Sequence, residues 1–265
     1  MAYPYRKFRK PRLGTPLNKG HRLSKGLVGY WLMNEGCGTT NADVSGNGNI
    51  GTISGATWSE GKFGSCLSFD GNNDWVDISD SGLPAFGTSD FTVIIWAKCP
   101  RDDANRALFS KGGWVAGEIL FYKHDSDKFT VYGNNGSINV AFGGTDSWPD
   151  DVWTQVAAVR SGSVLTVYQD TVKGSSDASA GADINTATDW RIGARDDGSR
   201  VFAGKIEYVM VYNRALSASE IALLYCEPFC MFEPTISPVF GSYYIPPVGN
   251  IGIMTTWGGY WGVTY

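Results

Sequence analysis

Histidine is scarce in this sequence, since its 265 residues include only His21 and His124. His21 lies in a strongly basic segment and His124 in the polar stretch HDSDK (124 to 128). A Ser-His-Asp or Cys-His catalytic arrangement would therefore need one of the two brought into an ordered cleft. The glycines of SGNGN precede a strand-like run and no helix, which excludes a phosphate-binding loop at a helix start. These absences argue against an enzyme.

Cysteine is limited to five residues, an odd number without C-x-x-C spacing, which predicts neither a zinc site nor a full disulfide framework. Cys37 and Cys66 can pair if their segments are neighbours, but we expect free, buried thiols. No segment reaches the roughly 18 apolar residues of a transmembrane helix, and the first residues lack the apolar stretch of about seven found in secretory signals. We therefore expect no membrane insertion. The predicted location is a virion surface or the extracellular space, reached by particle assembly, by lysis or after removal of a leader.

Acidic residues are absent from residues 1 to 25, which carry eight basic ones. The rest of the chain has 14 basic and 26 acidic residues, a net charge of −12. We interpret residues 1 to 25 as a basic arm, either solvated and disordered or docked on an acidic partner surface or nucleic acid. Basic residues are absent in turn from residues 227 to 265, where five prolines, six glycines and nine aromatics form an extension too apolar for a simple linker.

The region between these tails, residues 26 to 226, has the pattern of an all-β protein. Short alternating or apolar runs are separated by glycine and Asn/Asp turns. Residues 152 to 170 predict an antiparallel hairpin. The segment LSASEIALLY (216 to 225) predicts a short helix in which Ser217 and Glu220 form a capping box. The predicted strands are Leu27–Met33, Cys66–Phe69, Trp75–Ile78, Phe91–Lys98, Ala107–Lys111, Glu118–Tyr122, Phe129–Tyr132, Ile138–Phe142, Trp153–Arg160, Val164–Gln169, Trp190–Ile192 and Lys205–Tyr212.

Four blocks follow one another in a recognisable order. They are GLVGYWLMNEGCGTTNADVSGNGNIGT (26 to 52), ATWSEGKFGSCLSFDGNNDWV (56 to 76), FTVIIWAK (91 to 98) and FAGKIEYVMVYNRALSASEIALLY (202 to 225). In order and spacing they resemble the laminin-G-like, concanavalin-A-like lectin/glucanase domains, including those of phage virion proteins. The resemblance implies a two-sheet antiparallel jelly-roll sandwich with one short C-terminal helix, flanked here by two non-globular tails.

The loop DVSGNGNIGT is the best metal candidate, because its turns can direct backbone carbonyls toward a hard cation. In relatives of this type a structural calcium ion lies where this loop meets the last long strand. The resemblance implicates the Asp43 side chain, backbone oxygens of Gly46, Asn47 and Asn49, and Glu207, where the family usually has aspartate. The alternative is an Asn/Gly-rich turn satisfied by its own side chains.

Glycoside hydrolases of this fold place two carboxylates about 5 Å apart through the strand pattern E-x-D-x-x-E, which is missing here. A lectin surface needs only a stacking aromatic and polar neighbours. Loop residues Trp114, Trp148, Arg195, Asp197 and Arg200 are the candidates for such a carbohydrate-binding platform. Alternatively, the loop tryptophans seal the rim of the sandwich.

Two functions from different classes fit these features. The first is a non-catalytic virion-surface structural or decoration protein that displays a lectin-like, glycan-binding domain. Its arm and C-terminal extension would contact other copies or other virion subunits, and nucleic acid would bind only through the arm. The second is a stand-alone or accessory carbohydrate-binding module without an assembly role. A glycoside hydrolase is the weaker third hypothesis.

Overall fold

Two units make up the chain, Met1–Glu233 and Pro234–Tyr265. The computed structural model describes residues 9–80, 82–84, 86–113, 115–133, 138–141, 147–178 and 180–232, and the backbone of 254–257 and 260–263. In the second unit, β17 (Met254–Trp257) pairs antiparallel with β18 (Tyr260–Val263). Nowhere in these ranges is a helix long and apolar enough to cross a membrane.

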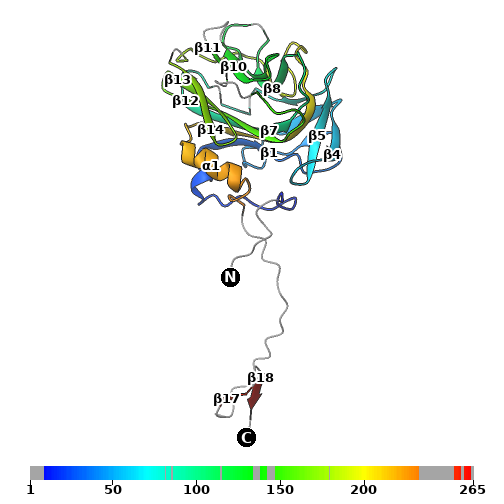
Figure 1. Ribbon diagram of the computed structural model, residues 1–265, viewed down its shortest axis with the longest axis vertical. Helices are drawn as coiled ribbons and strands as arrows, with labels where there is room; N and C mark the ends of the chain where they lie inside the picture. The colour runs from blue at the N-terminus through cyan, green and yellow to red at the C-terminus, as the bar shows by residue number, and fades with distance from the viewer. Residues whose placement is uncertain are drawn as a thin grey trace. The chain divides into compact units, whose positions relative to one another are not determined.

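Two antiparallel sheets lie face to face in the first unit (Figure 1). The first sheet has the order β14-β13-β12-β7-β16-β5-β4, with β1 also paired to β16. Its central strands β7 and β12 are buried along almost their whole length, and the near-continuous apolar sequence of β7 is typical of such a strand. The strands are β1 (Leu27–Trp31), β4 (Thr57–Glu60), β5 (Ser65–Asp70), β7 (Phe91–Lys98), β12 (Thr154–Ser161), β13 (Val164–Gln169), β14 (Val172–Asp177) and β16 (Ala203–Tyr212).

The second sheet has the order β11-β10-β9-β8-β15-β6-β3-β2. Its side chains alternate between two faces: residues such as Val76, Phe109 and Phe121 belong to the core between the sheets, whereas Ala107, Leu120 and Tyr122 form a small separate cluster. Together the two sheets confirm the predicted all-β antiparallel sandwich. The strands are β2 (Thr40–Asn41), β3 (Gly51–Ser54), β6 (Trp75–Ile78), β8 (Arg106–Lys111), β9 (Ile119–Lys123), β10 (Phe129–Gly133), β11 (Ile138–Ala141) and β15 (Trp190–Ile192).

Each of the twelve predicted strands is present, and the predicted hairpin is formed by β12 and β13. Besides β17 and β18 of the second unit, four short strands of the sandwich were not predicted, namely β2, β3, β4 and β14. They lie toward the sheet edges, where side chains are only partly buried and the alternation is weak. Between the sheets, the rings of Phe109 and Trp190 stack with centroids 4.8 Å apart.

A second apolar layer covers the outer face of the first sheet. Helix α1 (Ala218–Cys226) lies there beside the N-terminal segment (Figure 1). The predicted capping box is present, because Ser217 accepts from the Glu220 N–H and the Glu220 side chain accepts from the Ser217 N–H. Ile221 and Leu224 are buried in this layer.

The described part of the expected arm, residues 9–25, packs on this same face. Leu23 is fully buried, and the Asn18 N–H donates to the Met231 carbonyl at 2.8 Å. Phe232 forms a β-bridge with Leu17, so residues after 226 also belong to the sandwich. The structure thus differs from the expectation of a non-globular arm that ends at residue 25 and a non-globular extension that begins at residue 227. The sequence pattern emphasised the basic charge of the arm, whereas apolar residues such as Leu23 hold these segments on the sandwich.

All five cysteines are free, as expected, and Cys37 does not pair with Cys66. Only Cys66 and Cys99 are buried, whereas Cys37 and Cys226 are exposed. Burial raises the pKa of the Cys66 thiol to about 11 and that of Cys99 to about 12. These two thiols therefore stay protonated and behave as small apolar side chains.

Candidate functional site

The outer face of the second sheet is partly exposed where β6 and β15 lie next to the predicted carbohydrate-binding loop. Strand alternation fixes which residues it presents, because their neighbours Val76, Ile78 and Ile192 point into the core. The part of this face formed by β6 and β15 carries three polar or amphipathic side chains, here called the Trp75 platform: Trp75, Asp77 and Arg191.

The Trp75 platform is held together by its own contacts. The Trp75 indole N–H donates to Asp77 Oδ2 at 2.7 Å, and Arg191 Nε donates to Asp77 Oδ1 at 2.7 Å. The Arg191 guanidinium lies 4.9 Å from the centroid of the Trp75 ring, within cation–π range. An aromatic ring, a carboxylate and a guanidinium are thus fixed side by side on a partly exposed surface.

The loop between β15 and β16 folds onto the same face. Ser110 Oγ donates to the Ala194 carbonyl at 2.8 Å, and Arg191 also donates to the Asp196 carbonyl. Further along the loop, the Arg200 guanidinium lies 5.1 Å from the centroid of the Tyr122 ring. The loop is therefore anchored to the sheet at several points and presents its tip beside the Trp75 platform.

Asp197 lies at the exposed tip of this loop and accepts hydrogen bonds from the Ser199 N–H at 2.9 Å and the Ser199 hydroxyl at 2.6 Å. Partial burial works to raise the pKa of Asp197, but the Ser199 hydrogen bonds and the charges of Arg195 and Arg200 outweigh it and lower that pKa. The carboxylate is a charged, oriented hydrogen-bond acceptor.

Arg195 has a different environment from the one predicted. Its side chain is fully buried and forms an ion pair with Glu118, which is also buried. The prediction that Arg195 contacts sugar is therefore wrong, because a group inside the protein has no exposed surface for a ligand. Its guanidinium holds the loop against the sheet through the ion pair with Glu118.

Trp148 was also predicted wrongly, since it is only 1% exposed and belongs to the core between the sheets. It fits the alternative interpretation, a loop tryptophan that seals the sandwich. Trp114 lies outside the described residues. The adjacent Gly113 packs against Asp197. Of the five candidates, Arg195, Asp197 and Arg200 lie together on the loop between β15 and β16.

Sequence reasoning missed the Trp75 platform. The segment Trp-Val-Asp-Ile was predicted to be a strand, and its alternation already places Trp75 and Asp77 opposite the apolar Val76 and Ile78. That signal was present. What the sequence did not indicate is the pairing of β6 with β15, which brings Arg191 directly opposite Asp77.

The predicted metal loop is closed by its own groups. Asp43 Oδ1 accepts from the Tyr30 N–H and the Ser45 N–H, and Oδ2 accepts from the Ser45 hydroxyl and the Asn49 N–H, all at 2.8–3.1 Å. Four donors aimed at one carboxylate occupy the lone pairs that a calcium ion would need. The Asn49 amide donates to the Val28 carbonyl, and Asn47 donates to the same carbonyl.

Glu207, the acid expected to complete that site, shares no partner with Asp43. Its carboxylate accepts from the Lys62 N–H at 2.8 Å and the Phe63 N–H at 3.0 Å, and it pairs with Lys10. Within the described ranges, no group of three or more His, Cys, Asp or Glu side chains is placed to hold a metal. The described residues do not fit a calcium ion shared by Asp43 and Glu207.

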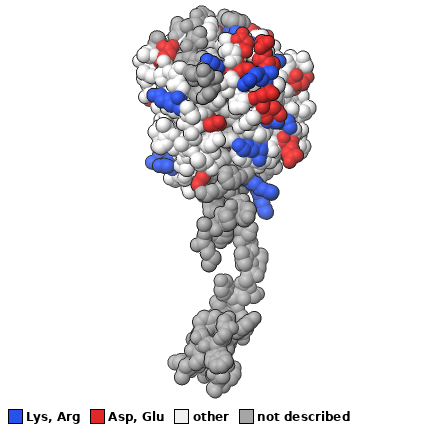
Figure 2. All heavy atoms as spheres, in the orientation of Figure 1, with Lys and Arg blue, Asp and Glu red and all other residues white. Residues whose placement is uncertain are grey.

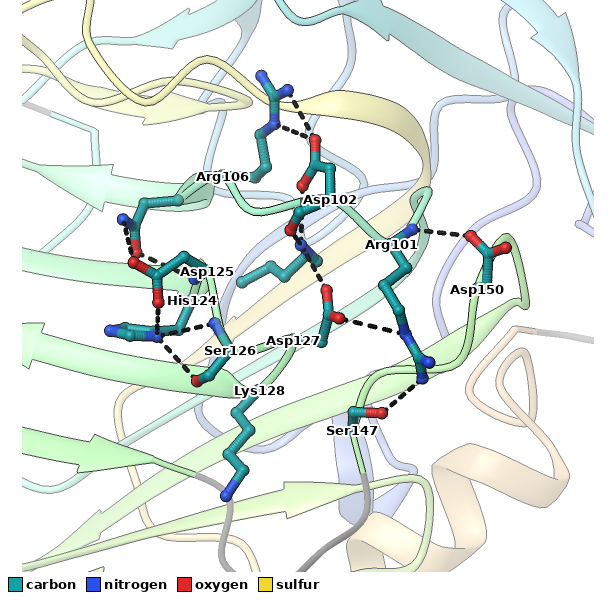
Figure 3. A network of polar contacts seen from close by, with 12 residues as sticks. Arg101, Asp102, Arg106, His124, Asp125, Ser126, Asp127, Lys128, Ser147 and Asp150 are labelled. Carbon is teal, nitrogen blue, oxygen red and sulfur yellow. Dashed lines mark hydrogen bonds and ion pairs between the residues drawn. The ribbon is translucent and has the colours of Figure 1, made fainter.

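The acidic cluster at 124 to 128 is a network of ion pairs (Figure 3). Lys123 Nζ lies 2.8 Å from Asp102 Oδ1 and 2.7 Å from Asp127 Oδ1. Asp102 also pairs with Arg106 at 2.7 Å. Burial works to raise the pKa of Asp102, but the hydrogen bonds from Lys123 and Arg106 outweigh it and lower that pKa. A general acid needs the opposite shift, so this cluster is suited to joining two loops.

Charged side chains of both signs lie close together on the face shown in Figure 2, mostly toward one side, and the rest of the described surface there is largely uncharged. This mixed distribution differs from a uniform single-sign field, which would indicate a highly charged partner.

Comparisons with known proteins agree with the fold. The model of the concanavalin A-like lectin/glucanases superfamily matches residues 70–222. Among proteins with curated functions, none matches this chain.

Three solved structures are similar at low identity. The binding domain of Paraclostridial Mosquitocidal Protein 1 has a TM-score of 0.64 and 17% identity, over 77% of this chain and 52% of that one. Domain 4 of AbnA, a GH43 extracellular arabinanase from Geobacillus stearothermophilus, solved with arabinotriose, has a TM-score of 0.57 and 18% identity, over 75% and 98%. Trypanosoma rangeli sialidase has a TM-score of 0.57 and 17% identity, over 78% and 33%.

This chain therefore spans about half of the mosquitocidal binding domain and a third of the sialidase, but almost all of the arabinanase domain. At these identities the likeness concerns the fold. The family match covers more than half of the chain and coincides with the second part of the sandwich, from the end of β5 to α1. The chain belongs to the concanavalin A-like lectin/glucanase superfamily.

Proposed function

We propose that this protein is a non-catalytic glycan-binding module whose binding surface is the Trp75 platform together with the loop tip at Asp197. The observation that carries the proposal is the fixed arrangement of Trp75, Asp77 and Arg191 on an open sheet face. Support comes from a similar domain, Domain 4 of AbnA, whose structure holds arabinotriose.

The chemistry of the platform suits a sugar. The apolar C–H face of a pyranose or furanose ring packs on an aromatic ring, and its hydroxyls pair with carboxylates and guanidinium groups that act as acceptors and donors. Because Asp77 already holds both Trp75 and Arg191, little side-chain freedom is left to lose on binding. A preorganised surface of this kind binds a ligand more tightly than a flexible surface with the same side chains.

The absence of catalysis is part of the proposal. Retaining glycoside hydrolases need a carboxylate nucleophile and a protonated acid about 5 Å apart. In the described part of the platform, Asp77 is tied to Arg191 and Asp197 to Ser199, and the lowered pKa of Asp197 works against a proton donor. Both groups are suited to hydrogen bonding with hydroxyls.

Substitution of Trp75 tests the proposed surface. We expect Trp75→Ala to weaken binding to array-selected glycans at least about fivefold, because it removes the stacking ring, which accounts for roughly 1 kcal/mol or more. Trp58→Ala is the matched control, since Trp58 is a half-buried tryptophan on β4 of the other sheet. Unchanged affinity of Trp75→Ala, or an equal loss in Trp58→Ala, would contradict the proposal.

The pH dependence of binding should follow Asp197. Its pKa is lowered, so the carboxylate stays charged as the pH falls. We expect affinity to be flat from neutral pH to about pH 5 and to decline only in stronger acid. The same titration on Asp197→Asn should lack the acid decline.

We further propose the more specific role of a virion-surface decoration protein. It is supported by the separate unit Pro234–Tyr265, which is rich in aromatic residues and is not needed to complete the sandwich. The native mass of the full chain tests this role. An oligomer that becomes monomeric on deletion of 234 to 265 is expected, and a monomeric full chain favours the stand-alone module.

A further inference from the structure

Strand β16 carries two neighbours on one edge. β7 pairs along its other edge, so β5 and β1 follow one another on the same side. The β5 ladder ends at the pair Ile206 and Leu67, and the β1 ladder ends at Val209 and Trp31. Glu207 lies at the junction, where the regular ladder is interrupted and carbonyl groups need other partners.

The ammonium group of Lys10 lies at this junction. Lys10 Nζ donates to the carbonyls of Met33 at 3.2 Å, Glu207 at 2.8 Å and Ser65. It also forms an ion pair with Glu207 Oε1 at 3.1 Å. The Lys10 and Glu207 side chains are only 4% and 0% exposed. One ammonium group therefore serves a cage of three carbonyl oxygens and one carboxylate, the Lys10 cage.

The walls of the Lys10 cage are fixed by further contacts. The two Glu207 oxygens accept from the Lys62 and Phe63 N–H groups, and the Lys10 N–H donates to the Phe63 carbonyl at 3.1 Å. Two backbone donors and one ammonium group thus compensate a fully buried carboxylate. Burial lowers the pKa of Lys10, and the charge of Glu207 opposes that effect.

The donor set is the one that hard cations use. Calcium and related ions bind carboxylate and backbone carbonyl oxygens. An ion pair alone would need only the carboxylate, whereas here three backbone carbonyls also converge on one positive charge. A solvent-open hollow of about 460 Å³, lined by Arg9 and the turn between β4 and β5, lies beside the cage and would let an ion approach.

We propose that the Lys10 cage is a cation site that the chain fills with its own ammonium group. The basic segment then acts as a tethered cation that joins β5, β16 and the segment that follows β1. The sandwich needs no dissolved metal at this position. The same cage becomes open to a hard divalent cation when the ammonium group is removed. This inference is independent of the proposed glycan surface, which lies on the other sheet.

Thermal unfolding of the full chain, in EDTA and in about 10 mM calcium chloride, tests the proposal. We expect the wild-type midpoint to be the same in both. Lys10→Ala should lower the midpoint by roughly 5–10 °C in EDTA, and calcium should recover a few degrees. Lys10→Met fills the cage with an uncharged stem, so its midpoint should fall without recovery. Lys19→Ala, at an exposed lysine of the same segment, is the control and should match wild type.

Three results would overturn the proposal. One is a wild-type midpoint that changes between EDTA and calcium; another is a Lys10→Ala midpoint equal to that of wild type. The third is a Lys10→Ala midpoint that falls in EDTA and does not rise in calcium, which would show that Lys10 is only an ion-pair partner of Glu207. If the Lys10→Ala variant does not fold, acetylation of the lysine amines in the native wild-type chain tests whether Lys10 is enclosed. Lys10 should react at least about tenfold more slowly than Lys19, and equal rates would contradict the cage.

Discussion

Arg195→Met is expected to lower the free energy of unfolding by about 3–5 kcal/mol, because the buried Glu118 carboxylate loses its guanidinium partner. Both side chains are inside the protein, where the loss of an opposite charge is costly. The loop between β15 and β16 should also become less ordered, since Arg195 joins it to the start of β9. Chemical denaturation of the purified variant measures the loss.

The double variant Glu118→Met, Arg195→Met provides the decisive comparison. Removing both charges leaves neither uncompensated, so much of the lost stability should return. Asp197→Ala is the control within the loop, because Asp197 is exposed and its loss should change stability by about 1 kcal/mol or less. If Arg195→Met instead kept its stability and lost only glycan affinity, Arg195 would contact the sugar directly, as the sequence first suggested.

The sandwich itself was predictable because it depends on local periodicity. Phe91–Lys98 is almost continuously apolar, Thr154–Ser161 has the apolar centre Val156–Val159, and both become central strands buried on both faces. The capping box at Ser217 was equally local, since both partners lie within one helical turn. Features that depend on neighbours in sequence were therefore correct, apart from the short edge strands.

The site was less predictable because exposure depends on which distant segments meet. Arg195 and Trp148 lie in polar loop sequences, and nothing local shows that Glu118 or the sheet core will enclose them. Lys10 is a similar case, because the carbonyls that it contacts belong to Met33, Ser65 and Glu207, which are far apart in the chain. Asp43 differs: the alternative of a self-satisfied Asn/Gly turn was open from the sequence, and the structure fits it.

Trp148→Ala is expected to lower the free energy of unfolding by about 3–5 kcal/mol, since it removes a large ring from the core between the sheets and leaves a cavity. The midpoint of denaturant unfolding measures this loss. Trp148→Phe is the matched control. In the described part of the chain the Trp148 indole N–H has no hydrogen-bond partner, so phenylalanine loses ring volume without breaking a hydrogen bond. Its cost should be well below that of alanine.

The comparison of Trp148 with Trp75 separates a stabilising tryptophan from a binding one. Trp148→Ala should lose stability, and at temperatures where the variant remains folded its glycan affinity should be close to wild type, because the ring is 1% exposed. Trp75→Ala should show the reverse pattern, with folding stability reduced by only about 1 kcal/mol and affinity lost, because Trp75 is only partly buried on the outer face of its sheet. A Trp148→Ala variant that stays fully stable yet no longer binds would move the glycan surface from the Trp75 platform to the Trp148 loop.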